Sequence, residues 1–310
     1  MIKIYRKENG ELEELDAFAK DCWINVHNPE QKEIEDLSRR FGIPSDFLTD
    51  PLDLDERARM ETEDGRTLVI VRIPVHYDTN LEIPYNTIPL GIILMEDAML
   101  TICALKSPVL QEFLDGRVKE FSTAHRSRFV IQIFGRAVMA YLRYLKHINA
   151  FTAILEKELR QTMKNEELFK LLNMVKGLVY FTTSLKSNDL MMDRFRRMDL
   201  LRMSPEERDL IDDILIDNKQ ALEMAQIYSS ILSGMMDAFA SLINNNVSEV
   251  MKVLTLVTII IMLPNLVASI YGMNVPLPIQ NSPFSFYIVL GISTLLAGGS
   301  IAYFAKKKWF

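Results

Sequence analysis

The chain has 310 residues, with 41 acidic and 35 basic side chains and a formal net charge of −6. This negative balance argues against nucleic acid as a partner, because domains that bind nucleic acid carry an excess of Lys and Arg. The length allows a soluble domain of about 200 residues together with a membrane part.

Residues 1–125 are predicted to form a cytosolic α/β domain. Apolar runs rich in β-favouring residues predict strands at 2–5, 22–26, 67–75, 88–94 and 99–104. A helix is expected to open at Asn28–Pro29 and to end near Gly42. Asp64–Gly65 is a strong turn dipeptide and separates an acidic segment from the third of these strands.

Residues 126–203 turn helical and are expected to form antiparallel cytosolic helices. The next helix has a clear start, because Ser204 and Glu207 make a capping box with Pro205 in the first turn. No further proline occurs before Pro264, so one helix of roughly 100 Å is predicted from Pro205 to Ile270. That length is about three times a bilayer core, so 204–252 is interpreted as a stalk helix and 253–271 as the first transmembrane helix.

One face of this long helix is polar from the stalk into the membrane segment. Steps of three and four residues follow one face of a gently supercoiled helix, and twelve of the fifteen positions reached from Gln220 are polar, charged or glycine. This polar seam consists of Gln220, Glu223, Ile227, Ser230, Gly234, Asp237, Ser241, Asn244, Ser248, Met251, Thr255, Thr258, Met262, Asn265 and Ser269. Because one helix cannot enclose water, a water-facing seam predicts several copies of the chain around an axis.

A single membrane anchor is the alternative interpretation, in which Ser and Thr side chains bond back to their own helix. It explains Thr255 and Thr258 one at a time. It does not explain Asn265, whose amide is costly in lipid unless it faces protein or water.

The first membrane helix is expected to end at Gly272, which can take the left-handed conformation that terminates helices. Asn274 then presents a neutral amide oxygen just past the membrane segment. A symmetric ring of such oxygens suits a hard cation that keeps its hydration shell.

The second predicted transmembrane helix covers 284–305 and contains no charged residue. Lys306, Lys307 and Lys308 follow in a basic tail, 306–310, which the positive-inside rule places in the cytoplasm. Two crossings put both termini in the cytoplasm, joined by an outer loop at 272–283, and the expected location is the plasma (inner) membrane with its lipid as surroundings.

The tetrapeptide Tyr271-Gly272-Met273-Asn274 resembles the signature of CorA-type magnesium channels, as do the run at 249–255 and the C-terminal run at 306–309. The resemblance implies a funnel-shaped homopentamer with an α+β cytosolic domain, a stalk helix and a two-helix transmembrane domain. It also implies a pore lined by the first membrane helix and Mg2+ as both transported and regulatory ion. The outer loop departs from the family, since many members carry an acidic residue there and this chain has none.

The resemblance assigns the selectivity filter to Gly272, Met273 and Asn274. It also suggests apolar constrictions that stop ions by dewetting at Met251, Leu254 and Met262, with packing between helices as the alternative role for these three side chains. The remaining pore-lining positions are Ser248, Thr255, Thr258, Asn265 and Ser269.

Three carboxylates are candidate metal ligands. Asp237 lies on the seam, so an oligomer would stack several carboxylates near one axis, and these repel one another unless a cation is present. The resemblance matches Asp213 and Asp50 to positions that bind Mg2+ between cytosolic subunits. An exposed helix charge is the alternative for Asp213, since Asp212 and Asp217 lie nearby.

The preferred interpretation is a passive channel for hydrated Mg2+, with Co2+ and Ni2+ as further possible cargo, that closes when cytosolic Mg2+ bridges its subunits. A zinc transporter of the same fold is the second interpretation, although the seam carries no His or Cys for a softer ion. A membrane-anchored cytosolic sensor or enzyme is the third. It predicts a catalytic constellation in residues 1–200, where the four histidines are scattered and no such motif is recognised.

Overall fold

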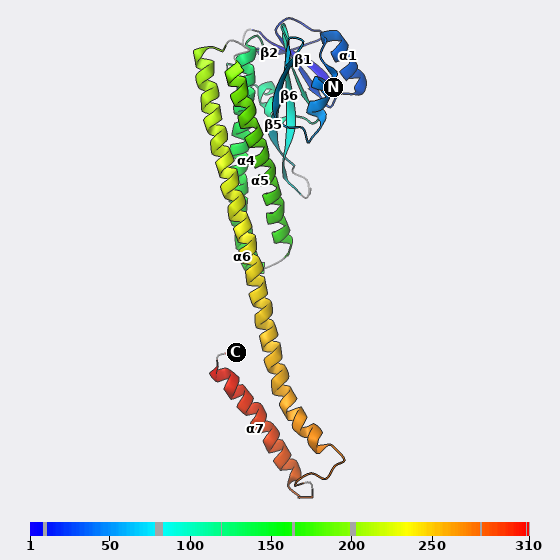
Figure 1. The fold of residues 1–310 in the computed structure, drawn as a ribbon, viewed down its shortest axis with the longest axis vertical. Helices are drawn as coiled ribbons and strands as arrows, with labels where there is room; N and C mark the ends of the chain where they lie inside the picture. Colours follow the sequence, from blue (N-terminus) through cyan, green and yellow to red (C-terminus); the bar gives the residue numbers. More distant parts are fainter. Residues whose placement is uncertain are drawn as a thin grey trace. The chain divides into compact units, whose positions relative to one another are not determined.

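The computed structural model describes residues 1–8, 11–77, 83–118, 120–162, 165–198, 203–279, 281–307 and 309 (Figure 1). Lys308, part of the predicted basic tail, lies outside these residues. The chain divides into two compact units, Met1–Met236 and Asp237–Phe310, and the helix α6, Pro205–Tyr271, runs from the first into the second.

A seven-stranded sheet forms the centre of the first unit, in the order β2-β1-β3-β7-β6-β5-β4. Its strands are β1 Ile2–Glu8, β2 Glu11–Leu15, β3 Cys22–His27, β4 Arg59–Glu63, β5 Arg66–His76, β6 Tyr85–Leu94 and β7 Ala98–Cys103. Among the strand pairs in the described part of the chain, β3 and β7 are parallel and the others are antiparallel. The five predicted strands are present, and the two edge strands β2 and β4 were not predicted.

Helices cover both faces of the sheet. On one face pack α1, Gln31–Phe41, and α2, Ser45–Thr49, which is followed by the short 3-10 helix η1, Asp50–Leu52. On the other face pack α3, Pro108–Leu114, α4, Arg126–Thr162, and α5, Asn165–Met198. Successive side chains of β3 point to opposite faces of the sheet and so enter different cores. Trp23 packs with α3 and α4, whereas Ile24 packs with α1.

The predicted start and turn signals take their expected geometry. Ser204 N–H donates to Glu207 Oε2 at 2.9 Å and Glu207 N–H donates to Ser204 Oγ at 3.2 Å, which completes the capping box of α6. Gly42 ends α1 with φ 60°, and Asp64 and Gly65 both have positive φ in the tight turn between β4 and β5.

The first turns of α6 lie beside α4 and α5 within the first unit (Figure 1). Ile211, Ile214 and Leu215 enter the core that α4 and α5 form on the sheet. The buried Asn218 amide donates to the Leu185 carbonyl of α5 at 3.0 Å. This stretch of α6 is therefore held by buried apolar contacts, as an amphipathic helix requires.

The second unit contains the rest of α6 and the helix α7, Ser285–Lys306. Both α6 and α7 contain a stretch long and apolar enough to cross a membrane. Few side chains in these stretches are buried within the chain. Apolar surfaces of this size require lipid or further copies of the chain around them.

Candidate functional site

Two threonines of the polar seam bond to their own helix. Thr255 Oγ1 donates to the Met251 carbonyl at 2.8 Å, and Thr258 Oγ1 donates to the Leu254 carbonyl at 2.8 Å. These two bonds match the anchor interpretation. They use only the hydroxyl hydrogen, so each Thr oxygen keeps acceptor capacity toward water or a hydrated cation.

Asn265 and Ser269 are exposed on the described chain and make no side-chain hydrogen bond within it. Asn265 lies one residue after Pro264, which stands inside α6 in the most apolar part of the chain. An amide in this position needs a polar partner, because an unsatisfied polar group in hydrocarbon costs several kcal/mol, on the order of 4–8 by transfer to cyclohexane. Within one chain, nothing in the described residues supplies that partner.

Three apolar side chains assigned to the pore project from α6. Met251, Leu254 and Met262 are 54%, 57% and 65% exposed, respectively. Side chains of this size remain exposed only when another surface covers them or when they line a passage. Their exposure on a single chain fits either the constriction or the helix-packing interpretation.

The end of α6 differs from the expectation at Gly272. The helix ends at Tyr271, and Gly272 does not adopt a left-handed conformation, since it is absent from the positive-φ residues of the described chain. Instead its N–H continues the helical pattern and donates to the Ala268 carbonyl at 2.9 Å.

Met273 and Asn274 follow on the exposed turn after α6. Met273 N–H donates to the Ile270 carbonyl at 3.3 Å, and Asn274 is exposed with its side chain unpaired among the described residues. The Asn274 amide is therefore available to a ligand or to other copies of the chain.

Asp50 lies at the start of η1 and carries an ion pair. Its Oδ2 accepts a hydrogen bond from Arg59 at 2.5 Å, and Arg59 also contacts Glu56 at 3.3 Å and Glu61. Burial raises the pKa of Asp50, and the Arg59 guanidinium opposes this shift. The predicted metal ligand therefore already has one cation beside it.

Asp213 and Asp237 lie on exposed positions of α6, the first in the unit Met1–Met236 and the second at the start of the next unit. Neither carboxylate makes a hydrogen bond or ion pair with the described residues, whereas the neighbouring Asp212 accepts from Arg196 at 2.5 Å. Within the described residues of one chain, no three His, Cys, Asp or Glu side chains group closely enough to hold a metal ion. One chain thus brings together none of the predicted ligands, and a shared site would require further copies.

Arg59 is a neighbour of Asp50 that the sequence analysis did not assign to the site. A signal was present, because Arg59 and Glu61 lie two residues apart on one face of β4 and Arg59 follows Asp50 by nine residues. Arg72 of β5 was also missed. Its guanidinium donates to the Leu54 carbonyl at 3.0 Å and to the Glu56 carbonyl at 2.5 Å, and it therefore anchors the segment that follows η1.

Comparison with known proteins identifies relatives over most of the chain. The family model of the CorA-like Mg2+ transporter protein matches residues 19–307. A cobalt/magnesium transport protein CorA from Methanocaldococcus jannaschii is 29% identical over 93% of this chain and 90% of its own length. One from Thermotoga maritima is 24% identical over 93% of this chain and 83% of its own length.

Solved structures agree with the predicted fold class. The complete structure of the CorA magnesium transporter from Methanocaldococcus jannaschii has a TM-score of 0.85 and 26% identity, covering 100% of this chain and 99% of its own. The full-length CmaX protein has a TM-score of 0.73 at 15% identity, covering 99% of this chain and 97% of its own, which is a likeness of fold. The expected architecture of a sheet-and-helix domain, a long helix and two C-terminal apolar helices is therefore confirmed.

Proposed function

Because the chain belongs to the CorA-like Mg2+ transporter family, we propose that it is a membrane channel for divalent cations with Mg2+ as its main cargo. Its relatives from Methanocaldococcus jannaschii and Thermotoga maritima are named cobalt/magnesium transport proteins. Members of this family are ion transporters of the membrane and not enzymes. The helices α6 and α7 cross the inner membrane, with both termini in the cytoplasm.

The observation that carries the proposal is the line of polar side chains on the apolar part of α6. Asn265 and Ser269 have no partner within the described chain, and Thr255 and Thr258 keep acceptor oxygens. A homopentamer that turns these faces toward a common axis gives each of them water or a hydrated cation as partner. The same arrangement turns Ser248, a polar position near the end of the stalk, toward the axis.

Selection takes place at the outer end of the path. A ring of Asn274 amides, held by the turn that Gly272 and Met273 make after α6, presents neutral oxygens to the entering ion. Mg2+ sheds its hydration shell reluctantly, so amide oxygens that bond the bound water molecules select it without dehydration. Met262 and Leu254 then form the apolar constrictions that close the path by dewetting.

Mg2+ is also the proposed regulatory ion. Asp213 and Asp50 of neighbouring subunits bind it between them, and Asp237 adds a further ring of carboxylates near the axis. A bridging cation relieves the repulsion between these carboxylates and favours the closed symmetric ring. Loss of the cation lets the subunits separate and widens the constrictions.

A zinc channel of the same fold is the competing proposal. Zn2+ is bound best by His and Cys, and the polar seam contains neither residue. The seam's oxygen donors therefore favour Mg2+, and Co2+ and Ni2+ are proposed as secondary cargo. A cytosolic enzyme or sensor leaves the polar line on α6 without a role.

Ion flux into liposomes that hold the purified protein tests the proposal. We expect Mg2+ influx well above that of empty liposomes, with Zn2+ influx near the background. Zn2+ influx that exceeds Mg2+ influx would favour the competing proposal, and no influx of any divalent cation would overturn both.

The regulatory part needs its own variants in the same assay. Asp213→Ala should remove the inhibition of influx by Mg2+ on the cytosolic side. Asp217→Ala, which changes another exposed carboxylate on the same helix, should leave that inhibition in place. Equal Mg2+ inhibition in the Asp213 variant and the unmodified protein would exclude Asp213 as a regulatory ligand.

A further inference from the structure

A cavity in the first unit lies where two neighbouring strands send the chain to opposite faces of the sheet. After β3 the chain continues to α1, which packs on one face, and after β7 it continues to α3, which packs on the other. The two strands are parallel, so the chain leaves both of them at the same end of the sheet, where their carboxyl ends lie. In sheets with this arrangement, a crevice for a ligand forms at the carboxyl ends of the diverging strands.

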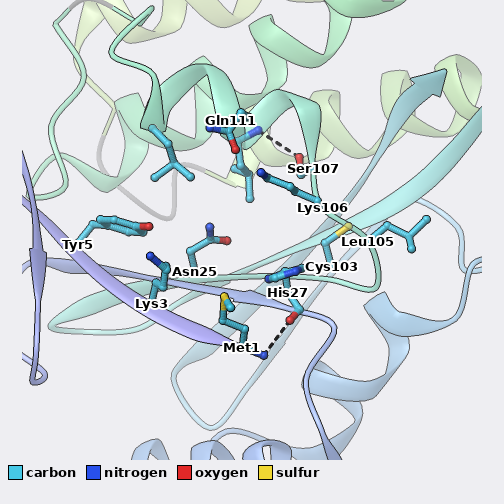
Figure 2. Close-up of a pocket in the computed structure, with 12 residues that line it drawn as sticks. Met1, Lys3, Tyr5, Asn25, His27, Cys103, Leu105, Lys106, Ser107 and Gln111 are labelled. Carbon is cyan, nitrogen blue, oxygen red and sulfur yellow. Dashed lines mark hydrogen bonds between the residues drawn. The ribbon is translucent and has the colours of Figure 1, made fainter. Parts of the chain in front are cut away.

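The cavity at the carboxyl ends of β3 and β7 has a volume of about 480 Å3, which is in the range of small-molecule sites. Figure 2 shows Tyr5 and Asn25 reaching into it from the strands, and Lys106 and Gln111 from the side of α3. Leu110 and Leu114 of α3 and the thiol of Cys103 add apolar surface. The lining thus combines an apolar wall with a few polar groups, as expected for a site that binds an organic molecule.

The charged residues that line the cavity are basic. Lys3 of β1 and Lys106, just before α3, contribute ammonium groups, and no Asp or Glu belongs to the lining. The N-terminal ammonium of Met1 also lies in the lining, but it pairs with Glu33 at 3.1 Å. Lys106 forms no ion pair with the described residues. This concentration of positive charge is notable in a chain whose net charge is −6, and it favours an anionic ligand.

Two further groups of the wall, the Cys103 thiol and the Tyr5 phenol, are neutral near pH 7. Burial raises the pKa of the Cys103 thiol to about 11 and also raises the pKa of the Tyr5 phenol. Both groups therefore keep their protons and add no negative charge. Lys3 Nζ donates to Glu14 Oε2 at 2.8 Å, but this pair is about half exposed and lies among the weak surface ion pairs.

We propose that this cavity binds a small phosphate monoester, with its phosphate between Lys3 and Lys106 and its organic part against Tyr5, Leu110 and Leu114. Two ammonium groups match the charge of a phosphate monoester, about −1.5 to −2 at pH 7. Lysine binds phosphate as a point charge, so such a site does not require arginine, which is absent from the lining. None of the lining residues is assigned to the proposed ion path, so the proposal does not depend on the transport function.

Calorimetric titration of the full-length protein with adenosine 5′-monophosphate tests the proposal. Adenosine provides the organic part without the charge, and inorganic phosphate provides the charge without the organic part. We expect the monophosphate to bind at least about tenfold more tightly than either fragment, which corresponds to about 1.4 kcal/mol. Adenosine binding as tightly as the monophosphate, or no heat with the monophosphate, would overturn the proposal.

Substitutions at the cavity separate this site from binding elsewhere. Lys106→Met should weaken binding of the monophosphate about tenfold, while Glu14→Gln should strengthen it because Lys3 loses its competing partner. Lys157→Met, an exposed position on α4, is the matched control and should bind as the unmodified protein does. Unchanged affinity in the Lys106 variant would refute the assignment even if the protein binds the nucleotide.

Discussion

Arg59 donates a hydrogen bond to the carboxylate of Asp50 at 2.5 Å, so a side-chain cation occupies the surroundings of a predicted metal ligand. The same guanidinium contacts Glu56 and Glu61, and one positive charge is therefore shared by three carboxylates. Under the proposed function, a regulatory Mg2+ at Asp50 competes with this tethered cation. The strength of the ion pair then helps to set the Mg2+ concentration that closes the channel.

Arg59→Ala is expected to make cytosolic Mg2+ inhibit influx at a lower concentration. An ion pair of this partial exposure contributes about 1 kcal/mol, so the half-inhibitory concentration should fall about fivefold. The measurement is Mg2+ influx into liposomes over a range of internal Mg2+ concentrations. Arg57→Ala removes a nearby exposed guanidinium that makes no ion pair with the described residues and should leave the curve in place. An unchanged or higher half-inhibitory concentration in the Arg59 variant would contradict the competition.

Asn274→Ala is expected to reduce Mg2+ influx to the level of empty liposomes while the protein still assembles. The substitution removes the amide oxygen that is proposed to bond the hydration shell, and it leaves the turn after α6 intact. Influx and size-exclusion chromatography of the same preparation measure the two properties. Asn281→Ala, an exposed amide in the same outer loop, is the matched control and should conduct normally. Normal influx through the Asn274 variant would exclude it from the filter.

The sequence predicted the elements that carry local signals. The capping box at Ser204 fixed the start of α6, and apolar runs located the five inner strands. The missed strands β2 and β4 are the two edges of the sheet, where charged side chains replace the apolar pattern. Edge strands are stabilised by pairing with a neighbour on one side, and such pairing leaves little trace in their own composition.

The candidate site was predicted as a set of positions, and its contacts could not be predicted. The polar seam was inferred from helical spacing and stays a prediction, because most described residues of α6 beyond Met236 are exposed, on and off the seam. The pairing of Asp50 with Arg59 depends on how η1 packs beside β4, which no local pattern specifies. The left-handed conformation expected at Gly272 was wrong, because its N–H continues the helical hydrogen-bond pattern to the Ala268 carbonyl.

Arg72→Met is expected to destabilise the first unit by about 3 kcal/mol. The guanidinium donates to three backbone carbonyls, those of Leu54, Glu56 and Thr87, and Arg72 makes no ion pair among the described residues. Removing the donors leaves partly buried acceptors without partners, which costs roughly 1–3 kcal/mol for each group that water cannot reach. Thermal unfolding followed by circular dichroism measures the loss.

The control for Arg72 is an arginine whose ion pair is exposed. Arg39 lies 3.8 Å from Asp36 with both side chains mostly in solvent, so Arg39→Met should change stability by less than about 0.5 kcal/mol. Equal losses in the two variants would show that the buried hydrogen bonds of Arg72 contribute no more than a surface charge does.

Cys103→Val is expected to make the protein less sensitive to alkaline pH. Burial raises the pKa of the Cys103 thiol from 9.0 to about 11, so the folded state holds this proton more tightly than the unfolded state. The thiol's contribution is fully present below pH 9 and is lost as the pH rises from 9 to 11. The shift corresponds to a loss of about 3 kcal/mol at most, since one pKa unit is about 1.4 kcal/mol.

The measurement is the midpoint of thermal unfolding at several pH values between 8 and 11. The slope of this midpoint against pH is compared between proteins, so that the titration of other groups cancels. The Cys103→Val variant should lose stability less steeply than the unmodified protein across this range. Ile102→Val removes one buried methylene from the same strand and no titratable group, so it should be less stable at every pH with an unchanged slope. Identical slopes in the Cys103 variant and the unmodified protein would show that the thiol titrates alike in the folded and unfolded chain.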